Sequence, residues 1–200
     1  NDSDSSKLVA SSKNGKYCAT EREEAGVSVI DVLHEKKVVS SIVLDHRISL
    51  HNRGPQDSPR VNFSNDGSMI FILSDSGEAR IWHSTNGRPV SAPMRHLAMI
   101  TSAQFTPDDK YLITTSFDKT ARVWDATSGL PLSPPLNHGI APVGFCELFL
   151  NDNRLVTHAM DRHIRLWTLP DNPIQAQDCI KIAELYSGCK LDSLGGVVPL

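Results

Sequence analysis

A block of 16 residues recurs four times without a gap, and this repeat constrains the fold more than any other feature of the chain. The blocks span residues 16–31, 68–83, 110–125 and 153–168. The clearest reads KYLITTSFDKTARVWD, with β-rich runs at Tyr111–Thr115 and Thr120–Trp124 around the polar turn Ser116–Lys119. Aliphatic, aromatic and Thr residues suit a pleated, half-buried surface. The repeated unit is therefore predicted to be a β-hairpin.

The spacing of the blocks predicts how the hairpins assemble. Trp82, Trp124 and Trp167 lie 42 and 43 residues apart, and Ile30 takes the same place in the first block. A period of about 40–45 residues with four strands per unit is typical of propeller blades. Because one twisted sheet cannot bury both of its faces alone, neighbouring sheets are expected to stack face to face. We predict an all-β fold with four four-stranded antiparallel blades, the last four of a longer propeller.

The predicted propeller segment covers residues 1–170, with blades at about residues 5–46, 59–96, 97–138 and 139–169. Residues 47–58 fit no strand pattern and are predicted to be a loop insertion. The polar run Glu21–Glu24 is placed in the hairpin turn of the first blade. The fourth strands of the second and third blades are placed at residues 88–92 and 130–133.

The end of the chain follows a different pattern. Pro170 and Pro173 interrupt the last strand of the fourth blade, because Pro cannot donate to a β-ladder. Residues 171–200 are predicted to form a C-terminal tail. Apolar residues at helical spacing predict one short helix over residues 174–189.

Composition and charge exclude several classes of protein. The net charge is −3 and the basic residues are scattered, which disfavours nucleic acid or an anionic membrane as a partner. No apolar run approaches the roughly 20 residues of a membrane helix, and no secretory h-region is visible. The four cysteines form no CxxC pair, so reduced thiols and a cytoplasmic location are expected.

On these residues the chain resembles WD-repeat β-propellers over about residues 5–169. Trp124-Asp125 is the Trp-Asp dipeptide of that family, and Ile30-Asp31, Trp82-His83 and Trp167-Thr168 are degraded versions of it. The resemblance implies a structural hydrogen-bond set in which Asp accepts from His, His contacts Ser, and Ser reaches the indole N–H. In the third repeat this set is His96, Ser116, Asp118 and Trp124. The matching residues elsewhere are His46, His138, Asp161, Trp82 and Trp167.

The other repeats depart from this set. Ala159 stands where the fourth repeat should have Ser, and Ser76 stands where the second should have Asp. Gly54 replaces the His of the second repeat, and Glu24 replaces the Asp of the first. The resemblance therefore implies that only the third repeat makes the full set.

No catalytic motif is present. Phosphate-binding GxxxxGK[ST], GxSxG, HExxH and the protein-kinase signatures are all missing. The best metal-like cluster, His158, Asp161 and His163, spans a hairpin turn, but the resemblance gives Asp161 a structural role. We predict no catalytic residue, metal or cofactor, and a protein that is not an enzyme.

The resemblance implies a non-catalytic scaffold for protein–protein interaction. Partners of WD-repeat propellers commonly dock where the loops before the first strands and the turns between the second and third strands meet. The residues expected at that surface are Phe117, Met160, Met99, Thr101 and Pro142.

A finer resemblance links the chain to bacterial, planctomycete-type WD-repeat proteins, through PLSPPLNH and the tail AELYSGCKLD. In these proteins such repeats often follow a Hanks-type serine/threonine kinase domain. The alternative function is therefore a C-terminal regulatory or sensory segment of such a kinase, with the kinase domain as a partner in cis.

Overall fold

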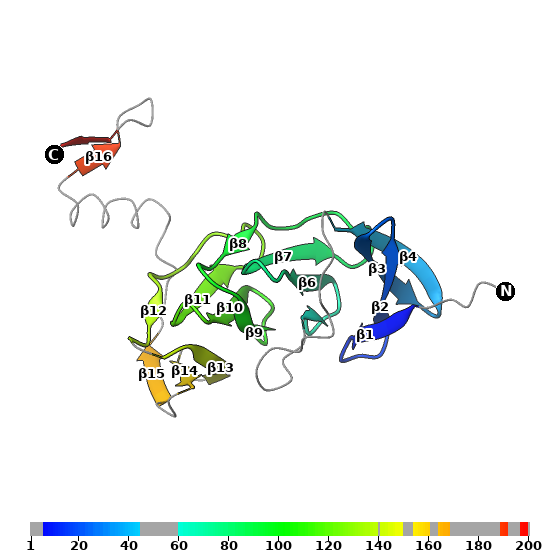
Figure 1. The fold of residues 1–200 in the computed structure, drawn as a ribbon. Helices are drawn as coiled ribbons and strands as arrows, with labels where there is room; N and C mark the ends of the chain where they lie inside the picture. Colours follow the sequence, from blue (N-terminus) through cyan, green and yellow to red (C-terminus); the bar gives the residue numbers. More distant parts are fainter. Residues whose placement is uncertain are drawn as a thin grey trace. The chain divides into compact units, whose positions relative to one another are not determined.

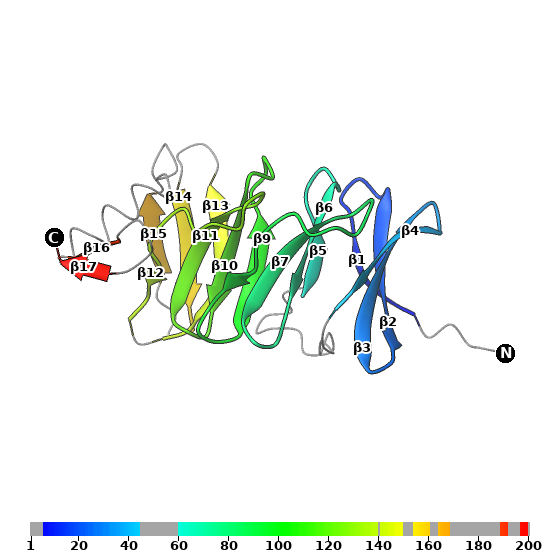
Figure 2. The same ribbon diagram turned by 90° about the horizontal axis from the view of Figure 1, so that it is seen from above.

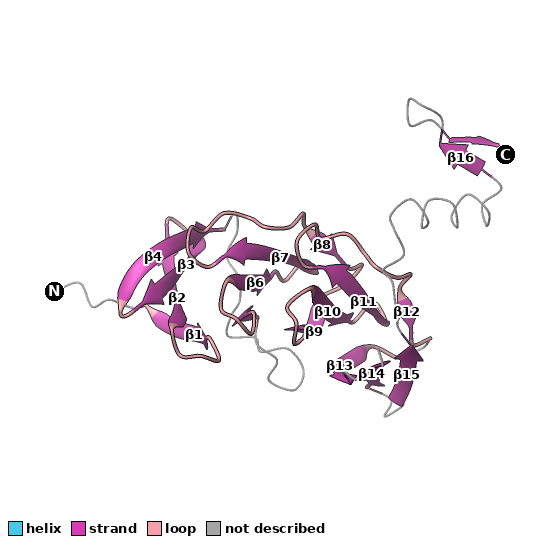
Figure 3. Cartoon of the chain, turned by 180° about the vertical axis from the view of Figure 1, so that it is seen from behind, coloured by secondary structure: helices cyan, strands magenta, loops and turns pink. Residues whose placement is uncertain are grey.

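The computed structural model describes residues 6–44, 60–139, 141–149, 154–160, 164–168, 189–191 and 197–199. All regular secondary structure in these ranges is β-strand (Figure 3). The chain divides into two compact units, residues 1–169 and residues 170–200. The helix predicted over residues 174–189 lies outside the described residues, except for Cys189, which begins a strand.

The strands of the first unit form four antiparallel sheets, each running up and down in chain order (Figure 1). The prediction of an all-β chain of successive antiparallel sheets is confirmed, with three strands described in the fourth sheet. The first sheet contains β1 (Lys7–Ser11), β2 (Tyr17–Glu24), β3 (Val27–His34) and β4 (Lys37–Val43). The second contains β5 (Val61–Phe63), β6 (Met69–Leu73), β7 (Glu78–His83) and β8 (Met94–Arg95). The third contains β9 (Ile100–Phe105), β10 (Tyr111–Ser116), β11 (Thr120–Asp125) and β12 (Leu136–Asn137). The fourth contains β13 (Val143–Phe149), β14 (Arg154–Ala159) and β15 (Ile164–Thr168).

Successive sheets stack face to face around shared apolar layers (Figure 2). Side chains alternate between the two faces of a strand, so adjacent residues serve different layers. Ile70 packs toward the first sheet, whereas Phe71 packs toward the third. The three layers bring together Val32 with Ile70, Phe71 with Leu112, and Ile113 with Leu155.

The turns between the first and second strands are built alike and are bonded to one another. In the third sheet, the Thr106 hydroxyl donates to Asp108 (2.6 Å) and accepts from the Tyr111 N–H (3.1 Å). Ser12 and Ser64 make the same contacts in the first and second sheets. The N–H of Asn65 also donates to the Asp109 carboxylate of the next turn (2.8 Å). This end of the stack is therefore fixed by polar contacts as well as by apolar layers.

The hairpin of the first sheet differs from the prediction. Its turn is Ala25-Gly26, where both residues have positive φ, at 52° and 83°. Glu24 pairs with Val27, so Glu21–Glu24 lies in strand β2 and its placement in the turn is wrong. A two-residue turn with positive φ at both positions matches the twist of the flanking strands. β2 and β3 have eight residues each and pair along their whole length up to this turn.

The longer hairpin also changes which residue stands in the place of Trp. Leu112 pairs with Trp124 in the third sheet, and the equivalent Cys18 pairs with Leu33 in the first. Leu33 therefore occupies that position, and the assignment of Ile30 to it is wrong. Ile30 instead belongs to the apolar layer against the second sheet.

The fourth strands also lie further along the chain than predicted. They are β8 and β12, whereas the predicted segments contribute only single bridges, Trp82 to Pro89 and Trp124 to Pro131. Neither bridge needs an N–H from Pro, because the residues on either side of it make the hydrogen bonds, such as the Val90 N–H to the carbonyl of Ile81. The chain resumes pairing only beyond these prolines, at Met94 and Leu136.

In the second unit, β16 (Cys189–Leu191) and β17 (Val197–Pro199) pair antiparallel. Lys190 lies opposite Val198 in this pair. No strand was predicted in this segment, and the hairpin is a feature that the helical interpretation of the tail missed.

Candidate functional site

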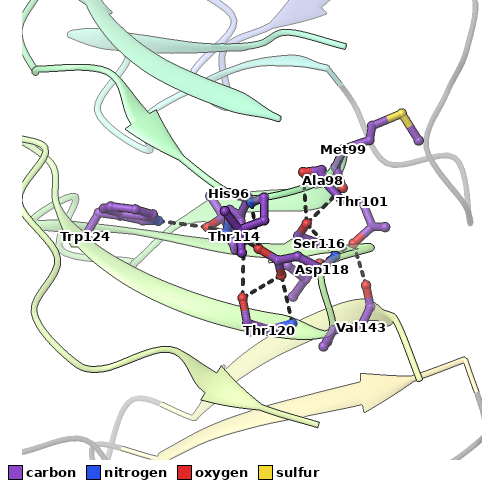
Figure 4. Close-up of polar contacts among 12 residues, drawn as sticks. His96, Ala98, Met99, Thr101, Thr114, Ser116, Asp118, Thr120, Trp124 and Val143 are labelled. Carbon is purple, nitrogen blue, oxygen red and sulfur yellow. Dashed lines mark hydrogen bonds and ion pairs between the residues drawn. The ribbon is translucent and has the colours of Figure 1, made fainter. Parts of the chain in front are cut away.

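A buried hydrogen-bonded bridge connects two strands of the third blade to the loop that leads into it from the second blade. The Trp124 indole N–H donates to the Thr114 hydroxyl oxygen over 2.8 Å. Nε2 of His96 lies 2.7 Å from the same hydroxyl (Figure 4). All three residues are buried. Thr114 therefore joins the indole on β11 to the imidazole that follows β8.

Asp118 completes the bridge and fixes its direction. Its carboxylate lies 2.8 Å from Nδ1 of His96 and accepts from the Leu97 N–H over 3.0 Å. Its other oxygen accepts from the Thr120 N–H (2.9 Å) and hydroxyl (2.6 Å). An ionised carboxylate only accepts, so the ring proton of neutral His96 sits on Nδ1. Nε2 is then the acceptor for the Thr114 hydroxyl proton.

The ionisation of this pair follows from its surroundings. Burial lowers the pKa of His96, and the positive charge of Arg122 acts in the same direction, against the attraction of Asp118. Burial alone would raise the pKa of Asp118, but hydrogen bonds from Thr120, Leu97 and His96 lower it. The pair is therefore a neutral imidazole donating to a carboxylate.

The bridging hydroxyl is not the one predicted. The Ser116 hydroxyl accepts from the Asp118 N–H (3.0 Å) and donates to the carbonyls of Ala98 and Met99. It has no hydrogen bond to His96 or Trp124 among the described residues. The prediction that Ser116 links these two is wrong, because Thr114 lies closer to the indole on the same face of β10. Ser116 instead closes the turn against the loop that precedes β9.

The fourth blade repeats the bridge, which corrects a second expectation. Nε2 of His138 approaches the Thr157 hydroxyl, and the Trp167 indole N–H donates to the same oxygen over 2.8 Å. Ala159 was counted as the missing member, but Thr157 supplies the hydroxyl. Asp161 lies outside the described residues, as does His46 of the first repeat.

The second blade lacks the bridge. Ile72 occupies the position of Thr114, since it pairs with Arg80 as Thr114 pairs with Arg122. The buried indole nitrogen of Trp82 has no hydrogen-bond partner among the described residues. The guanidinium of Arg80 lies over this indole at 4.9 Å from the ring centroid. Stacking and packing, rather than a hydrogen bond, hold Trp82 in place.

The polar bridge positions an exposed apolar segment. Leu97 is 92% exposed, and its backbone N–H is held by Asp118. The Phe117 N–H donates to the carbonyl of Met99 over 3.0 Å. Phe117 and Met99 are half-buried. Leu97 was not singled out from the sequence, although an apolar residue directly after the loop His was a usable signal.

The fourth blade presents its equivalent residues in the same way. The Met160 N–H donates to the carbonyl of Pro142 over 2.9 Å, as Phe117 does to Met99. Met160 is exposed and Pro142 is half-buried. We call Leu97, Met99, Phe117, Pro142 and Met160 the loop face.

Thr101 does not belong to the loop face. Its side chain is buried, and its hydroxyl contacts the Thr115 hydroxyl over 2.7 Å and the carbonyl of Val143 in the fourth blade. The prediction that Thr101 contacts a partner is wrong, because its hydroxyl is used to join the third blade to the fourth. This bond holds the two blades together beneath the loops.

Other kinds of site find little support in the structure. Within the described ranges, no three His, Cys, Asp or Glu side chains are grouped so that they could hold a metal ion. Asp161 and His163 of the suggested metal cluster lie outside those ranges. The part of the chain that is described also holds no helix with the length and hydropathy of a membrane span.

The hydrogen-bonded bridge of the third blade lies within a segment that can be matched to known proteins. Residues 87–125 match the WD domain, G-beta repeat family. His96, Thr114, Asp118 and Trp124 all fall inside the matched span. The match supports the WD-repeat family for this chain, while no curated protein matches its sequence.

Two solved structures with a similar fold are computationally designed proteins. The designed Ika4 protein has a TM-score of 0.60 at 15% identity, over 84% of this chain and 95% of that chain. The designed Ika8 protein has a TM-score of 0.59 at 17% identity, over 81% of this chain and 46% of that chain. At these identities the likeness concerns the fold alone. Stacked antiparallel blades of a β-propeller are the fold of the first unit.

Proposed function

We propose that the chain is a non-catalytic scaffold that binds another protein through its loop face. The observation that carries the proposal is Leu97, a large apolar side chain that is 92% exposed and anchored through its backbone to Asp118. Phe117 and Met99 flank it on hydrogen-bonded backbone. Met and aromatic residues are enriched in protein interfaces. A segment held in one conformation loses little entropy when a partner binds.

The buried bridge supports a structural role rather than chemistry. The His96 side chain has no exposed surface, and that of Asp118 is 4% exposed. Both ring nitrogens of His96 are already hydrogen-bonded. A general acid or base must come within hydrogen-bond reach of its substrate, which neither group can do in this arrangement. The His, Thr and Asp side chains serve to fix the blade and its loops.

The test compares proteins captured by the immobilised chain and by three variants. Leu97→Asp and Phe117→Asp place a charge on the loop face. Leu130→Asp is the matched control, because exposed Leu130 follows the opposite end of strand β11. The proposal expects at least one protein to bind wild type and the control but neither loop-face variant. Equal binding by all four chains would contradict it.

The bacterial origin and the link to a kinase remain part of the proposal, together with the cytoplasmic location. The bacterial origin and the kinase link rest on the resemblance of PLSPPLNH and of the tail, most of which lies outside the described residues. The cytoplasmic location rests on four cysteines that form no CxxC pair. If the chain acts on a kinase domain in cis, that domain should bind the loop face and compete with the captured protein.

A further inference from the structure

The fourth sheet exposes apolar side chains at positions that are covered in the other blades. Ile164 and Leu166 of β15 are 68% and 57% exposed. Register places them where the third sheet has Ala121 and Val123, which are 0% and 3% exposed. In the third sheet these positions lie on the face that packs against the fourth. The exposed face of the fourth sheet is therefore equivalent to the face of the third sheet that packs against the following blade.

The first sheet ends the stack with the opposite kind of face. Leu8 and Val43 are 61% and 63% exposed. Leu8 lies across from Thr20, as Ala103 lies across from Thr114 in the third sheet. Ala103 is buried in the layer shared with the second sheet. The exposed face of the first sheet is thus the side that, in later blades, packs against a preceding one.

The charges on this face of the first sheet are already paired. Nε of Arg22 lies 2.7 Å from the Asp31 carboxylate, and the Ser41 hydroxyl donates to the other oxygen of Asp31. A paired and hydrogen-bonded charge costs less to cover than an isolated one. The face can therefore be covered without leaving Asp31 unpaired.

We propose that a second copy of this chain covers both faces. The first sheet of one copy packs on the fourth sheet of the other, and the reciprocal contact closes a ring of eight blades. The exposed faces of the first and fourth sheets are the two complementary sides of the blade-to-blade interface. Packing them together repeats the contact that joins successive blades within one chain. The span that matches the designed Ika8 protein covers 46% of that chain, so two such spans account for nearly its whole length. A heterologous contact that returns to its start closes into a ring rather than a filament.

The test is sedimentation of the 200-residue chain over a range of concentrations. We expect a monomer–dimer equilibrium and no larger species. Leu166→Asp and Leu8→Asp should each weaken dimerisation by at least about tenfold, since each charge falls in both contacts. Leu130→Asp should dimerise like wild type. Circular dichroism should show that all variants are folded, because the altered side chains are exposed in the single chain.

A mixture of the Leu166→Asp and Leu8→Asp chains provides the sharper readout. One of the two contacts in a mixed dimer is then free of substitutions, so the mixture should associate more tightly than either variant alone. Ala19 belongs to the layer shared with the second sheet, so its neighbour Cys18 lies on the opposite face, which the second copy covers in the dimer. Its alkylation should slow as the wild-type chain dimerises.

Three results would overturn the proposal. One is a chain that stays monomeric at every concentration. If the β15 amides of that monomer are protected from hydrogen exchange, residues 170–200 and not a second copy would cover the fourth sheet. Another is a dimer that neither end-face variant weakens. The third is assembly into filaments, which would show that the contact does not close.

Discussion

Replacing Thr114 with Val tests the bridge that fixes the third blade. Valine keeps the shape of the side chain but removes its hydroxyl. The Trp124 indole N–H then loses its acceptor and Nε2 of His96 loses its donor, and both are buried. Each buried unsatisfied group costs about 1–3 kcal/mol, so we expect a loss of about 2–6 kcal/mol. Urea unfolding should show a lower midpoint with an unchanged m-value.

The indole resonances show which hydroxyl is responsible. The chain has 3 Trp residues, so three indole N–H cross-peaks are expected in a ¹⁵N-labelled sample. Thr114→Val should move the Trp124 peak upfield, because the N–H loses its hydrogen bond. Ser116→Ala also removes a buried hydroxyl, but it should leave that peak in place. A Trp124 peak that responds to Ser116→Ala and not to Thr114→Val would refute the reasoning.

Three further predictions address the other blades, a close backbone approach and pH. Thr157→Val should move the Trp167 indole peak in the same way, and an unmoved peak would count against the bridge in the fourth blade. Gly129→Ala should destabilise more than Gly26→Ala in urea unfolding. Both have positive φ, but only at Gly129 would the new Cβ meet a backbone oxygen, at 2.5 Å. Equal losses would contradict this. Because the pKa of His96 is lowered by folding, the unfolded chain takes up its proton first, so stability should fall as pH drops below about 6.5. Stability that is the same at about pH 7.5 and about pH 5.5 would rule out a neutral, buried His96.

The stacking of blades could be predicted because the length and the strand content of the repeat are both visible in the sequence. A hairpin that recurs at a period of 42 and 43 residues restricts the chain to a few architectures. The predicted runs Tyr111–Thr115 and Thr120–Trp124 also match β10 and β11, each of which ends one residue later. These features depend on local patterns that tertiary contacts did not override.

The identity of the bridging hydroxyl could not be predicted from alternation. Thr114 and Ser116 lie two residues apart and so share one face of β10. Only the register decides which of them lies beside the indole, and Leu112 opposite Trp124 places Thr114 there. The family resemblance favoured Ser116, which closes the turn instead.

The strand register of the first blade was predicted wrongly, because the gapless comparison of the repeats did not consider which residues favour a tight turn. Ala25-Gly26 was a usable signal for a two-residue turn, and it would have paired Glu24 with Val27. That pairing moves the position of Trp from Ile30 to Leu33. An apolar residue directly after the loop His pointed to Leu97, but its exposure depends on how Asp118 holds its backbone N–H, which the sequence does not show.

The most direct test of binding through the loop face is hydrogen exchange on the chain alone and with a captured partner. Amides of residues 97–99 and 116–119 should become more protected when the partner binds. Amides of residues 106–110 and 126–131, at the opposite end of the same blade, should exchange at unchanged rates. Protection confined to that opposite end, or spread evenly over both, would contradict the account.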